Sequence, residues 1–192
     1  MRNRMQTTVV SITILSGKAT LVFACIFLAL APAFAMGSKT TPPRLTVYMQ
    51  NAQGINIGTA TLSQAKNGLR ISLDLQGLTP GVHAIHVHQI SDCTPPDFKS
   101  AGGHFNPDRK QHGLGNPQGA HAGDIPNFTV DFNGKAKVTL IAPNLTLGDD
   151  PHSVFRGDGT ALVIHANADD MMTDPAGNAG DRVACGEIKK SW

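Results

Sequence analysis

Apolar and polar side chains alternate strictly in Leu69-Arg70-Ile71-Ser72-Leu73-Asp74-Leu75. Successive side chains of a β-strand point to opposite faces, so this pattern predicts a strand with one buried and one exposed face. The segment Ala136–Leu140 has the same pattern, and the pairs Asn67-Gly68 and Asn133-Gly134 precede the two segments. An Asn-Gly pair between alternating runs is a strong hairpin signal. Both stretches therefore predict antiparallel β-structure.

Further strand-like runs lie on both sides of this stretch. Eight strands are expected in all, at Arg44–Gln50, Gly58–Lys66, Leu69–Leu75, His83–Ile90, Phe128–Phe132, Ala136–Ile141, Ala161–His165 and Val183–Lys189. The chain has 20 Gly and 12 Pro, which favour turns, and no segment shows a sustained helical period. Short strands separated by turn signals predict an all-β sandwich or barrel.

Two long segments, 91–126 and 167–182, do not read as strands. The first is rich in Gly, Pro, Asp and His, and the second is rich in Asp, Gly and Ala. Loops of this length without secondary structure are uncommon and are usually either functional or disordered. Because the first segment holds three His and Asp124, we expect functional loops.

The first 35 residues read as a secretory signal peptide. Three basic residues precede an apolar run that ends in Ala33-Phe34-Ala35, a small-residue pattern typical of cleavage sites. An uncleaved membrane anchor and lipidation at Cys25 are the alternatives, but the apolar run of about 17 residues is short for a membrane span. We therefore expect a signal peptide over 1–35, a mobile leader over 36–43 and one domain over 44–192.

The net charge of the chain gives no support for a nucleic-acid partner. It is +2, and no block or stripe of basic residues is present. Residues 1–35 carry three basic and no acidic residues, so the remaining chain has a net charge of −1. No stable membrane association is expected after signal cleavage. Cys93 and Cys185 then remain, and an even pair of cysteines in an exported protein predicts one disulfide.

The histidines are arranged as a metal site would require. His86 and His88 lie two residues apart on an expected strand, so both imidazoles point to one face. The long loop adds His104, His112, His121 and Asp124, and a later strand ends at His165. Neutral imidazole is a good ligand for copper and zinc, and a carboxylate is an accepted zinc ligand. The sequence therefore predicts a metal site built from one loop and two strands.

Five motifs occur along the chain with a familiar order and spacing. They are His83-Ala-Ile-His86-Val-His88, Ala101-Gly-Gly-His104-Phe-Asn-Pro107, His121-Ala-Gly-Asp124, Leu162-Val-Ile-His165-Ala-Asn-Ala-Asp169-Asp170 and Gly177-Asn-Ala-Gly-Asp-Arg182-Val-Ala-Cys185-Gly186. From about residue 45 to residue 188, the chain resembles the copper/zinc superoxide dismutases. The resemblance implies an antiparallel eight-stranded Greek-key barrel or sandwich of immunoglobulin-like architecture. The loop lengths are similar to those of the secreted bacterial branch, which implies a periplasmic or extracellular location.

The resemblance also implies the role of each site residue. One copper per subunit would be held by His86, His88, His104 and His165. One zinc per subunit would be held by His104, His112, His121 and Asp124. His104 would bridge both ions, and Asp169 would link His86 to His112 from outside the ligand sets. Arg182 would attract and orient the substrate anion beside copper, and Cys93 and Cys185 would form the disulfide within the subunit.

The implied reaction is the disproportionation of superoxide to dioxygen and hydrogen peroxide. Copper would cycle between Cu(II) and Cu(I), His104 would carry a proton, and zinc would be structural. An exported copper-binding or buffering protein without turnover is the main alternative, and a structural domain with metals that only add stability is another. Arg182 favours the enzyme, because metal storage or stability does not require a cation facing copper. Both a monomer and a homodimer are compatible with the sequence.

Other residues are expected to lie outside the catalytic chemistry. His83 is three residues before His86 and so points to the opposite face of an extended strand, where a structural hydrogen-bonding role is expected. His152 is expected on the surface, and Met171-Met172 is expected to pack within its loop. The lysine and threonine that guide the anion in common eukaryotic members have no counterpart in the second loop. Lys99, Arg109 and Lys110 are candidates for that steering role.

Overall fold

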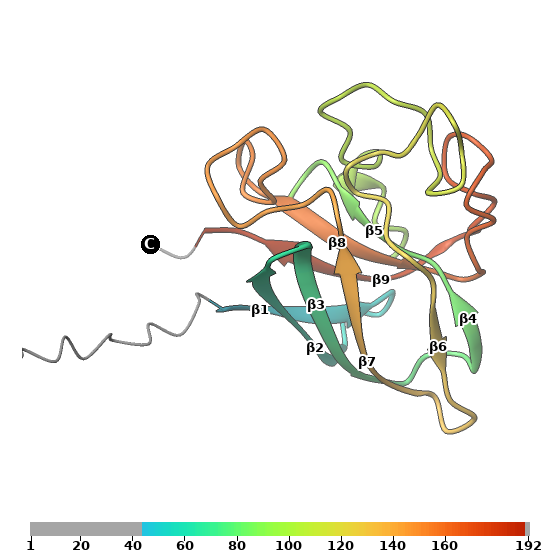
Figure 1. Cartoon of the computed structure of the whole chain (residues 1–192). Coiled ribbons are helices and arrows are strands. Elements are labelled where there is room, and N and C mark those ends of the chain that lie inside the picture. Colours follow the sequence, from blue (N-terminus) through green and yellow to red (C-terminus); the bar gives the residue numbers. More distant parts are fainter. Residues whose placement is uncertain (1–43, 191–192) are drawn as a thin grey trace, which may run out of the picture. The chain divides into compact units, whose positions relative to one another are not determined.

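The computed structural model describes residues 44–190 (Figure 1). The expected signal peptide, the expected leader and the last two residues of the expected domain lie outside this part. Its elements are β1 (Arg44–Asn51), β2 (Asn56–Ala65), β3 (Gly68–Gln76), β4 (Gly81–His83), β5 (Ile85–His88), the 3₁₀ helix η1 (Lys99–Ala101), β6 (Phe128–Val130), β7 (Lys135–Ala142), β8 (Thr160–His165) and β9 (Arg182–Ile188). In the described range, no helix has the length and apolar character needed to cross a membrane.

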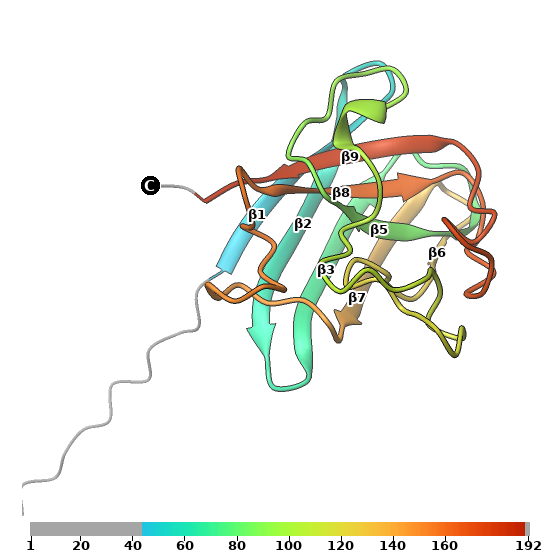
Figure 2. The same ribbon diagram turned by 90° about the horizontal axis from the view of Figure 1, so that it is seen from above.

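The strands form a strongly curled antiparallel sheet. Seven of them hydrogen-bond in the order β5-β8-β9-β1-β2-β3-β7, and β4 and β6 form a separate pair. Because β4 runs into β5 and β6 packs beside β7, the short pair links the two ends of the seven-stranded sheet. Figures 1 and 2 show the result as two packed layers, with β1, β2, β3 and β7 in one layer and β5, β8 and β9 in the other. The expected all-β fold is confirmed, and the connections β3–β4 and β7–β8 join strands that are not neighbours, as in a Greek key.

One expected strand, His83–Ile90, is divided in the structure. Its first part, β4, pairs with β6, whereas β5 pairs with β8. The change occurs at Ala84, whose N–H donates to the carbonyl of Asn167 and whose carbonyl accepts the N–H of His165. Residues 44–190 therefore contain nine strands where eight were expected, because the backbone partner changes within one run of strand-forming residues.

The alternation in β3 decides which face of the sheet is buried. Leu69, Ile71, Leu73 and Leu75 are at most 3% exposed and belong to the main core, while Arg70 is exposed. Burying a leucine or isoleucine side chain contributes about 1.5–3 kcal/mol, so a shift of one residue in register would be strongly unfavourable. The expected orientation of this strand is confirmed.

The first Asn-Gly pair has a different role from the one its sequence suggests. The two turn residues are Lys66 and Asn67, and Gly68 is already paired with Ala65. Gly68 has φ +129°, and a Cβ there would lie 2.4 Å from the carbonyl oxygen of Ala142 on β7. Glycine is required at this position by the close approach of the neighbouring strand.

Two long loops cover the outer face of β5 and the end of β8. Residues 89–127 connect β5 to β6, and residues 166–181 connect β8 to β9. Figure 1 shows both loops gathered at the side of β5. The two segments expected as loops are therefore neighbours in space, and they enclose the expected metal ligands.

Candidate metal centre

The pairing of β5 with β8 brings the strand histidines together. His86 lies opposite Val163 and His88 lies opposite Ala161. Ile85 and Val87 belong to the core, so the alternating histidines face the side covered by the loops. His165 ends β8, and its Nε2 is 3.4 Å from Nε2 of His88. The His-x-His spacing on β5 therefore places the imidazoles of His86 and His88 on the same side as that of His165 at the end of β8.

A first group of four histidines forms a compact donor set. One ring nitrogen from each lies within 4.8 Å of the others, and all four residues are buried: His86, His88, His104 and His165. Nδ1 of His86 and Nε2 of His104 have no hydrogen-bond partner in the described chain. Because buried polar atoms are normally satisfied, two unpartnered imidazole nitrogens in this cluster fit a metal ion. A donor set of four imidazoles suits copper.

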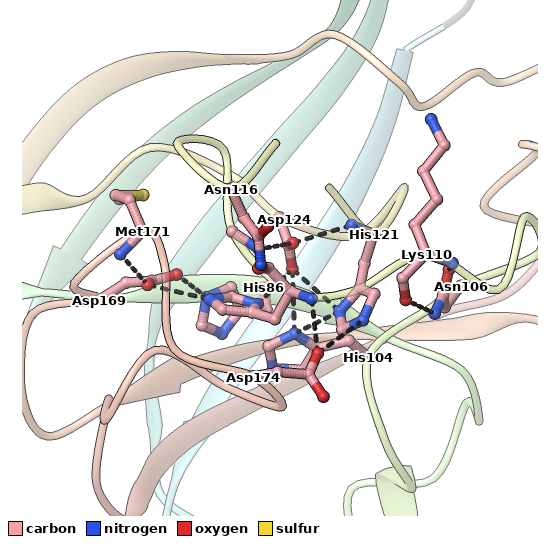
Figure 3. A network of polar contacts seen from close by, with 12 residues as sticks. His86, His104, Asn106, Lys110, Asn116, His121, Asp124, Asp169, Met171 and Asp174 are labelled. Atoms are coloured by element: carbon pink, nitrogen blue, oxygen red, sulfur yellow. Dashed lines mark hydrogen bonds and ion pairs between the residues drawn. The ribbon is translucent and has the colours of Figure 1, made fainter. Parts of the chain in front are cut away.

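A second group converges on one carboxylate oxygen (Figure 3). Oδ1 of Asp124 is 3.0 Å from Nδ1 of His104, 3.0 Å from Nδ1 of His112 and 3.4 Å from Nδ1 of His121. These are the four residues expected to hold zinc. The potential ligand atoms that lie within 4.8 Å of one another belong to a slightly different set, which is His86, His104, His112 and Asp124. This set contains His86 in place of the expected zinc ligand His121. Three imidazoles and a carboxylate match the ligand chemistry of zinc.

His104 belongs to both groups through different ring atoms. Its Nδ1 contacts Asp124, and its Nε2 is the unpartnered atom on the side of the four-histidine group. The arrangement suits a bridging imidazole between two cations, since both nitrogens can lose their protons there.

Asp169 connects the two groups from behind. Its Oδ2 is 2.7 Å from Nε2 of His86, and its Oδ1 is 3.0 Å from Nε2 of His112. Although burial opposes ionisation, hydrogen bonds from His112 and His86 hold the pKa of Asp169 well below its usual range. An ionised carboxylate therefore fixes the ring orientation of one imidazole from each group.

Gly177 leaves the space that Asp169 occupies. A Cβ at this position would lie 1.8 Å from Oδ1 of Asp169 and 2.8 Å from Nε2 of His112. We expect Gly177→Ala to displace Asp169, to weaken metal retention and to lower the free energy of unfolding by about 1–3 kcal/mol. Gly157→Ala is the matched control, because Gly157 has nearly the same φ, +61° against +62°, and nothing within 4 Å of its Cβ position. Thermal melts and metal analysis should separate the two variants, and equal behaviour would contradict this role.

Burial keeps several of the histidines neutral. It lowers the pKa of His104 to about 4 and that of His165 to about 3, and it lowers the pKa of His88 as well. His112 differs: burial alone would lower its pKa, but hydrogen bonds to Asp124 and Asp169 raise it to about 9. Neutral imidazole is the form that binds metals, so His88, His104 and His165 are prepared for a cation at neutral pH.

These pKa values predict how the stability of the metal-free protein depends on pH. In the unfolded chain each histidine has a pKa of about 6.5, so below this value the unfolded state binds more protons than the folded state at His104 and His165. The free energy of unfolding should therefore fall as the pH is lowered from about 6.5 towards 4. The stabilisation from His112 is complete below about 6.5 and is lost only as the pH rises through about 9. Urea denaturation of chelator-treated protein at several pH values measures this, and a flat profile between pH 6.5 and 4 would contradict it.

Arg182 lies beside the four-histidine group at the start of β9. Its two terminal nitrogens donate to the carbonyls of Phe98, at 2.6 Å, and Gly102, at 2.7 Å. A cavity of about 300 Å³ is lined by His88, Gly103, His104, Asn106, His121, His165, Pro175, Ala176, Gly180 and Arg182. A guanidinium has five N–H donors, so donors remain for an anion in this cavity.

The sequence of residues 56–188 matches the copper/zinc superoxide dismutase family. The chain belongs to this family. It is 50% identical over 141 residues to superoxide dismutase [Cu-Zn] 1 of Aquifex aeolicus, covering 72% of this chain and 83% of that protein. A crystal structure of a double mutant of a superoxide dismutase-like protein from Bacillus subtilis has a TM-score of 0.73 and 40% identity, covering 76% of this chain and 97% of that chain. The copper/zinc superoxide dismutase of Brucella abortus has a TM-score of 0.66 and 31% identity, covering 77% and 100%.

The disulfide expected in this superoxide dismutase is present in the structure. Cys93 and Cys185 are bonded and lie 92 residues apart in the chain. The carbonyl of Cys93 also accepts Nε2 of Gln50 at 2.7 Å, and its N–H donates to Glu187 at 3.2 Å. The bond therefore ties the loop that holds Arg182 to β9, and a loop of about 90 residues corresponds to roughly 4–5 kcal/mol in the chain-entropy treatment.

The residues expected outside the superoxide dismutase site lie outside both donor groups. The two ring nitrogens of His83 each contact a carbonyl oxygen at 2.7 Å, those of Thr79 and His165, so its structural role is confirmed. His152 forms a surface pair with Asp108 at 3.0 Å. The N–H of Met171 donates to Asp169 at 2.6 Å, so this residue supports the site through its backbone.

Three residues that position the site carry no recognisable motif in the sequence. Asn127 donates to the carbonyl of Asp169 at 2.8 Å and accepts its N–H at 2.9 Å. Asn116 donates to the carbonyl of His112 at 2.9 Å, and Asp174 accepts the N–H of His112 at 2.6 Å. Asn127 and Asp174 act on the backbone of site residues 42 and 62 positions away in the chain, whereas Asn116 is only four positions from His112. No local pattern marks such a contact.

Proposed function

We propose that this chain disproportionates superoxide at a copper centre held by His86, His88, His104 and His165. We also propose that zinc is held by His104, His112, His121 and Asp124. The observation that carries this proposal is the convergence of two donor groups on His104, together with the unpartnered Nδ1 of His86 and Nε2 of His104. Bound copper supplies the electron exchange, by which one superoxide is oxidised to dioxygen and a second, with two protons, is reduced to hydrogen peroxide.

His104 holds and moves a proton in this proposal. Its Nδ1 is engaged on the side of Asp124, so Nε2 is the atom that takes up a proton and delivers it to the reduced substrate. His104 is therefore a catalytic residue as well as a ligand.

Asp169 and the zinc ligands keep the rings in place. Zinc has no redox chemistry, so its role is to orient His104 and to hold the loop 89–127 against the strands. Asp169 contacts one copper-side and one zinc-side imidazole, and this links the geometry of the two sites. The ring orientations of His86 and His112 would thereby be fixed together.

Arg182 binds and orients superoxide. Its guanidinium is anchored by two carbonyls and lines the cavity that also contains His88, His104 and His165. An anchored guanidinium attracts a small anion and directs it by charge-assisted hydrogen bonds. The second cavity that Arg182 lines, of about 450 Å³, also contains Lys99.

Lys99 is the best placed of the three candidate steering residues. It is exposed, pairs with Asp97 at 2.9 Å and shares a cavity with Arg182. Neither of these two cavities is lined by Arg109 or Lys110, and in Figure 3 the ammonium group of Lys110 points away from the histidines. Lys99 therefore adds positive potential at the approach to Arg182, although Asp97 and Asp181 reduce it.

Export is the cellular context that fits the chain best. Residues 1–35 have the charge, apolar run and cleavage pattern of a signal peptide. The Cys93–Cys185 disulfide persists in oxidising compartments. We propose that residues 1–35 are removed on export to the periplasm or the extracellular space. Both a monomer and a homodimer are compatible with this proposal.

The test of function is catalysed superoxide decay by the purified protein, loaded with zinc and titrated with copper. We expect a fast rate that saturates at one copper per chain. A tightly bound copper without catalysis would instead support an exported copper-binding protein without turnover. Metal analysis of the same samples gives the stoichiometry of both ions.

A further inference from the structure

The carboxylate of Asp174 reaches two of the proposed zinc ligands from the loop between β8 and β9. Its Oδ1 accepts the backbone N–H of His112 at 2.6 Å and lies 3.8 Å from Nε2 of His121. Figure 3 shows Asp174 next to the histidine cluster. Its side chain is about half exposed, whereas that of His121 is 8% exposed. The residue therefore lies at the edge of the site, with one oxygen directed inwards.

The other non-bridging histidines reveal a pattern that includes Asp174. In each, the ring nitrogen that faces away from its donor group contacts an oxygen: Nε2 of His86 and of His112 contact Asp169, Nδ1 of His88 contacts the carbonyl of Gly102, and Nδ1 of His165 contacts the carbonyl of Gly180. His121 directs Nδ1 towards Asp124, so its outward atom is Nε2. The oxygen that Nε2 of His121 faces belongs to Asp174.

The turn that carries Asp174 is itself well braced. Oδ1 of Asp170 accepts the N–H groups of Met172 and Thr173 at 2.9 and 2.8 Å, and its Oδ2 accepts Nδ2 of Asn178 at 2.8 Å. The carbonyl of Thr173 accepts the N–H of Gly177 at 2.6 Å. The backbone next to Asp174 is thus fixed by contacts that do not involve a metal ligand.

We infer that Asp174 is a positioning residue for zinc: it orients the His121 ring through Nε2 and holds the backbone of His112. This rests on the proposed zinc site. A metal-bound imidazole gains basicity and a defined tautomer when its other N–H meets a carboxylate, and loss of such a partner typically lowers metal affinity by about 10–100-fold. Because Asp174 is half exposed, we expect its removal to lower the zinc affinity by about tenfold, which is the lower end of this range.

Two substitutions separate this role from a purely structural one. Asp174→Asn keeps an oxygen that can accept the His112 N–H, but it removes the negative charge that faces His121. Asp174→Ala removes both contacts. If Asp174 only caps the His112 backbone, the Asn variant should bind zinc like the unchanged protein and only the Ala variant should bind it weakly. If Asp174 positions His121, both variants should lose affinity.

The measurement is the zinc dissociation constant of the copper-free protein, obtained by competition with a chromophoric chelator. The visible spectrum of cobalt bound in place of zinc is the second readout, since it reports ligand geometry directly. We expect about tenfold weaker zinc binding and an altered cobalt spectrum for Asp174→Asn, with little change in the melting temperature of the chelator-treated protein. Asp108→Asn is the matched control, because it removes an exposed Asp–His pair from the other loop without touching a ligand.

The outcomes distinguish this inference from the proposed function. If the unchanged protein binds one zinc per chain and Asp174→Asn binds it within about twofold with the same cobalt spectrum, the role of Asp174 is wrong and the zinc site stands. If the unchanged protein does not bind one zinc per chain, the zinc site itself is wrong, and this inference is wrong with it.

Discussion

Arg182→Ala should slow catalysed superoxide decay by at least about tenfold while the content of copper and zinc stays unchanged. The guanidinium lines the cavity beside the four-histidine group and donates hydrogen bonds to the carbonyl oxygens of Phe98 and Gly102. Removing it takes away the positive charge and the hydrogen-bond donors that face the anion, but no metal ligand. Decay rates at several ionic strengths, with metal analysis of each sample, measure the effect.

Two further variants define the origin of that loss. Arg182→Lys keeps the charge and loses the forked donor geometry, so an intermediate rate is expected. Arg70→Ala removes the same charge from the exposed face of β3 and should leave the rate nearly unchanged. The rate of the unchanged protein should fall with added salt, and that of Arg182→Ala should fall less. A fully active Arg182→Ala protein would show that this residue does not guide the substrate.

His112→Ala should cause the largest loss of stability. Its imidazole contacts two buried carboxylates, Asp124 and Asp169, each at 3.0 Å. Breaking a buried ion pair typically costs about 3–5 kcal/mol because a charge is left unpaired. For a domain of this size, that corresponds to a fall of roughly 6–20 °C in melting temperature. The variant should also bind less than one zinc per chain, so that stabilisation by the bound ion is lost as well.

Calorimetry without added zinc measures the loss of stability from the broken ion pairs, and calorimetry with added zinc measures the loss of stabilisation by the bound ion. His152→Ala is the matched control, since His152 pairs with Asp108 on the surface and such pairs contribute less than about 1 kcal/mol. Addition of zinc should raise the melting temperature of the control but not that of His112→Ala. A His112→Ala protein that keeps one zinc and the original melting temperature would rule out a zinc site at this residue.

The local sequence is sufficient to predict most of the strands and the orientation of the histidines that lie on them. Alternation over Leu69–Leu75 specifies a buried face, because each side chain in a strand is placed by its immediate neighbours. The same rule placed His86 and His88 on one face. It did not foresee the division of the expected strand at Ala84, because that depends on hydrogen bonds with Asn167 and His165, about eighty residues away in the chain.

The positions of the metal ligands that come from the loops depend on the tertiary structure. The types and spacing of His104, His112, His121 and Asp124 indicated metal ligands and, by resemblance, their partition between two ions. That they meet at Oδ1 of Asp124, with Asp169 behind them, is a property of two folded loops. Asp174 and Asn127 were invisible in the sequence, because they reach the backbone or the outward nitrogen of distant residues. Sequence periodicity determines which side of a strand a residue faces, whereas long-range hydrogen bonds between loops determine which side chains support the ligands.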